Sequence, residues 1–196
     1  MSRATAQPET RETASEQPRA SDPAAAPPEA QHESDHMRRQ RVEAGAGDLF
    51  GRPFGALVVG DRFVTAGRRA RERDILDFAA LTGDAHPQHT DPEWAAGSRF
   101  GEQIAHGLLV LSFAVGLLPL DPDRIVALRR VGDAVFKQPV KIGDTVHVEG
   151  QIVRTREVDS EHGLVEARLR ILRQPAGRQE PARMAVRADV ELVWRS

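Results

Sequence analysis

The stretch "GLLVLSFAVGLL", residues 107–118, is apolar on every side and stops just before Pro119. Such a run is long for a strand, and proline cannot continue a helix, so we expect a helix that ends at Leu118. A helix that is apolar all round must be buried in the protein. At about 18 Å it is too short to cross a bilayer core.

After this run the hydrophobic period changes to two. Apolar residues take alternate positions in residues 144–153, 164–172 and 184–194, and charged residues take most of the others. In the last segment the apolar set is Met184, Val186, Ala188, Val190, Leu192 and Trp194. This pattern is typical of half-buried antiparallel strands. A further strand is expected from residue 124, bulged at Gly132 and ending at Pro139, before a turn at Gly143 and Asp144.

Two helical segments are expected ahead of the apolar run. Asp74 is a candidate N-cap for a helix that stops at Gly83, and Asp91 is a candidate cap for a short turn that begins at Pro92. No alternation of strands and helices follows. The fold class is therefore predicted as α+β, with a curved antiparallel sheet wrapped around one long central helix.

Composition limits the possible functions. The chain has 196 residues, a net charge of -2 and no cysteine. We therefore expect no nucleic-acid partner and no membrane partner, and the sequence excludes a cysteine nucleophile and thiolate metal ligands. The first residues lack the basic-then-apolar pattern of a secretory signal, so a cytoplasmic location is the default expectation.

The first fifty residues differ from the rest. They are rich in Pro, Ala and Glu and nearly free of large apolar side chains, so residues 1–50 are expected to be a disordered tail and residues 51–196 the folded domain. The tail is either a docking or linker segment or a dispensable extension.

The densest polar stretch is "GDAHPQHTD", Gly83 to Asp91, just before the apolar run. On residue types alone, Asp84 and His89 are either a proton-transfer pair or a turn cap and a satisfied loop histidine. His86 and His106 add two more nitrogen ligands. No helical His-x-x-x-His pair or cysteine supports a metal site, so none is expected.

Three motifs carry a family resemblance. Gly83-Asp84, Pro87-x-His89 and Ala105-His106-Gly107, followed by "FKQPVKIGDTV" at residues 136–146, resemble the MaoC-like (R)-specific enoyl-CoA hydratases and 3-hydroxyacyl dehydratases of the hot-dog fold. In the family pattern an Asn stands where this chain has His86. The departure bears on rate, pH optimum and substrate rather than on fold.

The resemblance implies the roles of the site residues. Asp84 and His89 would form the catalytic dyad. Ser112 matches a serine that supports it, although the alternative is a hydroxyl bonded only to a backbone carbonyl. The backbone amide of Gly107, at the free first turn of a buried helix, is the candidate oxyanion donor, and the alternative is a glycine needed only for helix–sheet packing. His86 would shape the loop and contact substrate, while His106 would order the entry to the helix. The family uses no metal, and no other cofactor is expected.

The expected reaction is reversible hydration and dehydration of (3R)-hydroxyacyl and 2-enoyl thioesters of coenzyme A or acyl-carrier protein. Cations for the phosphate of such a substrate are available near the strand after the helix, although each could equally lie on a solvated face: Arg129, Arg130, Lys137 and Lys141.

Two alternatives stay open. Many hot-dog thioesterases place a carboxylate on the central helix, and residues 107–118 have none. A non-catalytic subunit of a heteromeric dehydratase would not need Asp84 and His89, although His86 keeps this alternative open. A single hot-dog unit exposes a sheet edge, so a homodimer is expected.

Overall fold

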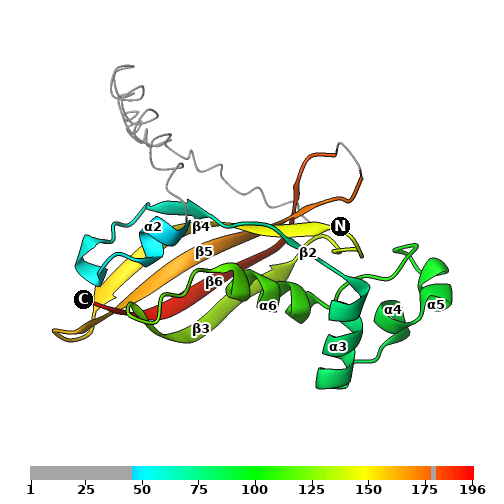
Figure 1. Ribbon diagram of the computed structural model, residues 1–196, viewed down its shortest axis with the longest axis horizontal. Coiled ribbons are helices and arrows are strands. Elements are labelled where there is room, and N and C mark those ends of the chain that lie inside the picture. The colour runs from blue at the N-terminus through cyan, green and yellow to red at the C-terminus, as the bar shows by residue number, and fades with distance from the viewer. Residues whose placement is uncertain (1–45, 178–179) are drawn as a thin grey trace, which may run out of the picture.

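The computed structural model describes residues 46–177 and 180–196. A six-stranded antiparallel sheet curves around helix α6, and helices α3, α4 and α5 lie together beyond one end of it (Figure 1). The strands are β1 (Arg62–Val64), β2 (Arg68–Arg69), β3 (Ile125–Phe136), β4 (Thr145–Glu157), β5 (His162–Gln174) and β6 (Arg183–Arg195). The helices are α2 (Ala46–Phe50), η1 (Phe54–Ala56), α3 (Glu72–Thr82), α4 (Pro87–Thr90), α5 (Pro92–Ala96) and α6 (Gly107–Leu117). This is the hot-dog arrangement that the sequence predicted.

The strand order is β1-β4-β5-β6-β3, and β2 also pairs with β4. The inner strands show the alternation of buried and exposed residues that the sequence predicted. Val146, Val148 and Leu169, for example, are fully buried. Helix α6 packs against β4 and β6. Strand β3 is bulged after Gly132, as expected, with Asp133 at a positive φ of 49°. It ends at Phe136 rather than at Pro139.

Strand β6 departs from strict alternation in two ways. The register shifts opposite Ile171 and Leu172, so Ala185 is fully buried and Met184 only partly so. The predicted polar face is also covered. Asp189 and Glu191 are buried beneath ion pairs with Arg168 and Arg129, because β6 lies between two neighbouring strands that carry arginines.

The central helix is not buried on every side. Leu108 is 62% exposed and Ser112 and Gly116 are exposed, which places one open stripe along α6 at a spacing of four residues. The prediction that this helix is buried on every side was therefore wrong. It rested on the number of apolar residues, and the sequence alone does not show which face of the helix the sheet covers.

Two boundaries also need correction. The folded part begins earlier than residue 51, because Leu49 and Phe50 of α2 are buried in the core. The rest of the predicted tail lies outside the described residues. Helix α3 begins at Glu72, so Asp74 is its third residue and not its N-cap. The Asp74 carboxylate accepts a hydrogen bond from the backbone amide of Arg71, the residue that precedes the helix (2.9 Å). Within the described ranges no helix is both long and apolar enough to span a bilayer.

Candidate active site

The candidate active site is a cavity of about 350 Å³ at the start of α6. Helix α3, the loop after it and helix α4 each contribute to its wall, and Gly107 and Phe136 close the side toward the sheet. The other lining residues are Phe78, Thr82, Asp84, His89, His106 and Leu108. The structure thus brings Asp84 and His89 together beside the helix start.

His89 is oriented by the chain that leads into α6. Its Nδ1 lies 2.7 Å from the Ile104 carbonyl oxygen. A carbonyl only accepts, so Nδ1 carries the hydrogen and Nε2 keeps its lone pair. The side-chain Nε2 of Gln103 donates to the His89 carbonyl oxygen at 2.9 Å and fixes the backbone there. His89 is therefore held as a base with one free nitrogen.

Electrostatics keep His89 uncharged near neutral pH. Burial lowers the pKa of His89 below its usual 6.5, and His106 and His86 act in the same direction. The hydrogen bond to Ile104 and the charge of Asp84 oppose this shift in pKa. Because the lowering prevails, the Nε2 lone pair is available at physiological pH.

His106 joins the two members of the pair. It is 2% exposed, its ring stacks on that of His89 at 3.8 Å between centroids, and its Nε2 donates to the Asp84 carbonyl oxygen at 2.9 Å. The buried Nδ1 of His106 has no hydrogen-bond partner within the described part of the chain. The sequence assigned His106 only to the helix entry, whereas the structure shows that it also contacts both Asp84 and His89.

Gly107 lines this cavity at the first residue of α6. The first helical hydrogen bond of α6 runs from the Val110 amide to the His106 carbonyl (3.1 Å), so the Gly107 amide precedes the bonded turns. Phe136 packs on this glycine, since a Cβ atom at position 107 would lie 2.8 Å from its ring. Glycine is therefore required at position 107 because the Phe136 ring of β3 lies against it.

The other two predicted site residues lie at the edge of the site or outside it. His86 caps α4 by accepting from the Gln88 amide through Nδ1 (3.1 Å), and its ring meets Trp94 edge-on at 5.3 Å. Ser112 is exposed and donates to the Leu108 carbonyl of its own helix (2.8 Å). Neither is among the residues that line the cavity.

A metal could draw on three of these groups. Asp84, His89 and His106 each offer a ligand atom, all within 4.8 Å of one another. The two imidazole planes are stacked at 29°, so their in-plane lone pairs run side by side instead of converging on one point. This arrangement suits proton transfer better than chelation.

Most of the predicted phosphate cations are already paired. Arg129 pairs with Glu191, Arg130 with Glu166 at 3.4 Å, and Lys141 with Glu102 at 2.6 Å. Lys137 instead lines a second cavity together with Arg99 and Phe136. Sequence reasoning assigned no site role to Arg99 or Phe136, because neither belongs to a polar cluster and only the fold brings them to one cavity with Gly107.

Comparisons with known proteins identify the family to which the chain belongs. The profile of the family described as "MaoC like domain" matches residues 56–173. The chain is 38% identical over 100 residues to Protein MaoC of Klebsiella aerogenes, across 50% of this chain and 30% of that protein. It is 33% identical over 102 residues to the (R)-specific enoyl-CoA hydratase of Aeromonas caviae, across 52% of this chain and 75% of the relative.

A solved structure, the MaoC-like dehydratase from Rhodospirillum rubrum, superposes with a TM-score of 0.63 at 26% identity, covering 74% of this chain and 99% of that one. The chain spans less than a third of the Klebsiella protein, so only the domain is compared there. Since the profile covers more than half of the sequence, the chain belongs to the MaoC-like domain family.

Proposed function

We propose that this protein catalyses the reversible hydration of 2-enoyl thioesters to (3R)-hydroxyacyl thioesters. One observation carries the proposal: Asp84, His89 and the first amide of α6 meet at one largely apolar cavity. The relative from Aeromonas caviae is named as an (R)-specific enoyl-CoA hydratase, which supports the same reaction and the same stereochemistry.

The groups present can perform each step. In hydration, a water held between the Asp84 carboxylate and His89 loses a proton to Nε2 as its oxygen bonds to C3. The protonated Nε2 of His89 then gives this proton to C2, so that one water adds across the double bond and the imidazole returns to its neutral form. The Gly107 amide donates to the thioester oxygen, which becomes enolate-like in the transition state, at the positive end of α6. Dehydration is the reverse.

The test uses crotonyl-CoA and purified protein, with loss of the enoyl absorbance as the readout. We expect turnover, and a fall of about 10²–10⁴-fold in kcat for Asp84→Asn and for His89→Ala, which is the usual contribution of a positioned acid or base. Circular dichroism of each variant checks that the fold is kept.

Two outcomes would contradict the hydratase. Release of free CoA without hydration would indicate a thioesterase, although α6 carries no carboxylate. Full hydratase activity in both dyad variants would show that the cavity at α6 is not where the reaction occurs.

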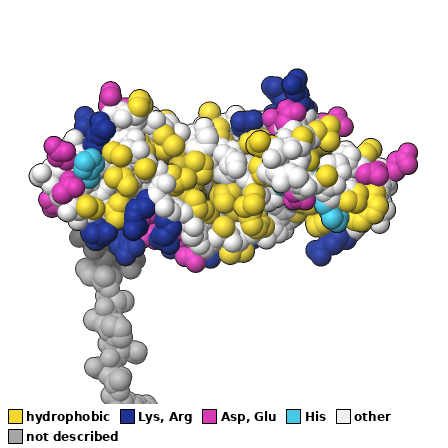
Figure 2. All heavy atoms as spheres, turned by 90° about the horizontal axis from the view of Figure 1, so that it is seen from below, with side chains coloured by type: hydrophobic (Ala, Val, Ile, Leu, Met, Phe, Trp, Pro, Cys, Tyr) yellow, Lys and Arg dark blue, Asp and Glu magenta, His cyan; other side chains and the backbone are white. Residues whose placement is uncertain are grey.

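We also propose that the protein works as a homodimer paired through β3. This strand is an edge of the sheet and exposes Val126, Leu128, Val131 and Val135, while α6 exposes Leu108 beside it. Figure 2 shows apolar side chains across the middle of this face, with most charged side chains toward the two ends. Light scattering should give twice the chain mass at micromolar concentration, and a stable monomer would contradict the pairing.

A further inference from the structure

The carbonyl that orients His89 belongs to a segment with little regular structure of its own. The Ile104 carbonyl oxygen accepts from Nδ1 of His89 at 2.7 Å, and Ile104 lies between the largely exposed loop of residues 97–101 and the start of α6. A carbonyl keeps its direction only where the chain around it is held in place. The orientation of the base therefore depends on what anchors residues 102–105.

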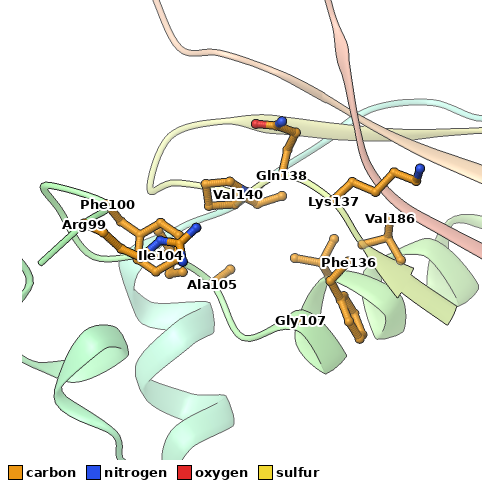
Figure 3. A pocket seen from close by; sticks show the side chains of 12 residues that line it. Arg99, Phe100, Ile104, Ala105, Gly107, Phe136, Lys137, Gln138, Val140 and Val186 are labelled. Carbon is orange, nitrogen blue, oxygen red and sulfur yellow. The ribbon is translucent and has the colours of Figure 1, made fainter.

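On the sheet side, this segment is held by the chain that leads into β4. Ile104 forms an isolated antiparallel bridge with Lys141, and the Ala105 amide donates to the Val140 carbonyl oxygen at 2.8 Å. Figure 3 shows Ile104 and Ala105, on the chain that leads to Gly107, beside Val140. A single bridge is short compared with the ladders of the sheet, so the chain before Ile104 needs a further anchor.

Glu102 supplies this anchor. Its carboxylate pairs with Nζ of Lys141 at 2.6 Å, and its carbonyl oxygen accepts from Nε2 of Gln88 at 3.0 Å. Glu102 therefore connects α4, which carries His89, to the residue that bridges Ile104. In the described part of the chain, Lys141 is the only ion-pair partner of Glu102.

Lys141 is fixed by a buried ion pair of the sheet. Its backbone amide donates to Oδ2 of Asp144 at 2.9 Å, and the same oxygen accepts from Nη1 of Arg173 on β5 at 2.7 Å. Asp144 is only 3% exposed. Because the backbone of Lys141 is held in this way, its ammonium group reaches Glu102 from a defined position.

We propose that Lys141 and Glu102 are positioning residues for the base, and that their ion pair holds the Ile104 carbonyl oxygen against Nδ1 of His89. This rests on the proposed function, in which His89 transfers the proton. Neither residue of the pair lines the first cavity, so the pair acts through Ile104 and not on the substrate. The pair is partly exposed and adds little to global stability, so its effect is expected in the rate.

The first test measures kcat and KM for crotonyl-CoA in Lys141→Met, Glu102→Gln and the double variant. We expect each single change to lower kcat about three- to fivefold with KM unchanged, in line with the loss of one partly exposed ion pair. The double variant should lose no more than either single one, because both remove the same interaction. Lys141→Arg keeps the pair and should restore most of the rate.

The matched control is Arg170→Met. It breaks an exposed ion pair with Glu149 on the sheet, of similar length at 2.7 Å, and should leave kcat unchanged.

A second test follows the base itself. NMR titration of the His89 imidazole measures its pKa in the absence of substrate. The hydrogen bond to Ile104 raises the pKa of His89, so a weaker bond in Lys141→Met should lower this pKa further below 6.5. The other titratable groups that act on His89 are unchanged in this variant: Asp84, His86 and His106.

Four kinetic results would overturn the assignment: additive losses in the double variant, no recovery in Lys141→Arg, an equal loss in Arg170→Met, or a rise in KM for Lys141→Met alone. The last would mean that the ammonium group contacts the substrate. If no thioester is hydrated, the proposed function fails by itself. The NMR titration still tests the ion pair in that case, and an unchanged pKa of His89 in Lys141→Met would reject its positioning role.

Discussion

The sheet and the segment of residues 83–107 differ in the contacts that stabilise each of them. Strands β4, β5 and β6 are joined by long backbone ladders over buried apolar side chains. The segment has only the short helices α4 and α5, and side-chain contacts to the backbone fix its shape: Gln88 to Glu102, His89 to Ile104, Gln103 to His89 and His106 to Asp84. Stability therefore resides mainly in the sheet, and the geometry of the site mainly in the polar contacts. Substitutions in the two regions should have separable effects.

The largest effect on stability is expected for Gly150→Ala in β4. A Cβ atom there would lie 2.0 Å from the ring of Phe63, which is itself buried in the core and opposite on β1. Because neither strand can retreat easily, we expect the free energy of unfolding to fall by about 3 kcal/mol, at the upper end of common overpacking costs. Urea unfolding followed by circular dichroism measures this. Gly47→Ala in α2, with open space around its Cβ, is the control.

The matching change in the site segment is Gly107→Ala. Here the obstructing ring is that of Phe136, which is 51% exposed and can turn aside. We expect kcat/KM for crotonyl-CoA to fall at least about tenfold, since the thioester oxygen loses its position at the amide. The free energy of unfolding should change by less than about 1 kcal/mol, because the ring moves into solvent. A loss of stability as large as that of Gly150→Ala would remove the distinction between the two regions.

The same distinction explains what the sequence could predict. Alternating apolar residues predicted β4 and β5 closely, because burial on one face of a ladder is written in the local period. The Gly-Asp, Pro-x-His and His-Gly motifs predicted residues that the structure brings to one cavity. The buried acids of β6 were not predicted, because arginines on neighbouring strands cover them.

Tertiary contacts also decided which polar residues reach the site. His106 contacts Asp84 from 22 positions away, and Phe136 reaches Gly107 from another strand. Ser112 was predicted from its match to a serine of the family, but its hydroxyl donates to a carbonyl of its own helix. For the residues of the loop before α6, spacing along the chain could not predict these contacts, since this loop has no regular period from which side-chain direction could be read.

A smaller, pH-dependent effect is expected for His106→Phe. Burial is the main cause of the lowered pKa of His89, and His106 adds to it. A phenyl ring keeps the burial and the stacking but removes the nearby charge. The pKa of His89 should therefore rise toward 6.5, and the acid limb of kcat/KM should move to higher pH. His147→Phe, on β4 away from the site, is the control and should leave the acid limb in place. An unchanged limb in His106→Phe would mean that the stacked ring does not tune the base.

The smallest effect is expected for Ser112→Ala. The hydroxyl is exposed and bonded to the Leu108 carbonyl, so its removal leaves no buried group unsatisfied, and alanine favours the helix. The free energy of unfolding should stay within about 0.5 kcal/mol and kcat/KM within about twofold of the parent. A large fall in kcat with unchanged stability would show the opposite, namely that the exposed stripe of α6 reaches a reacting thioester once two copies pair. In that event the site would belong to the dimer and could not be assigned to one chain, and the separation between sheet and segment would hold only within a subunit.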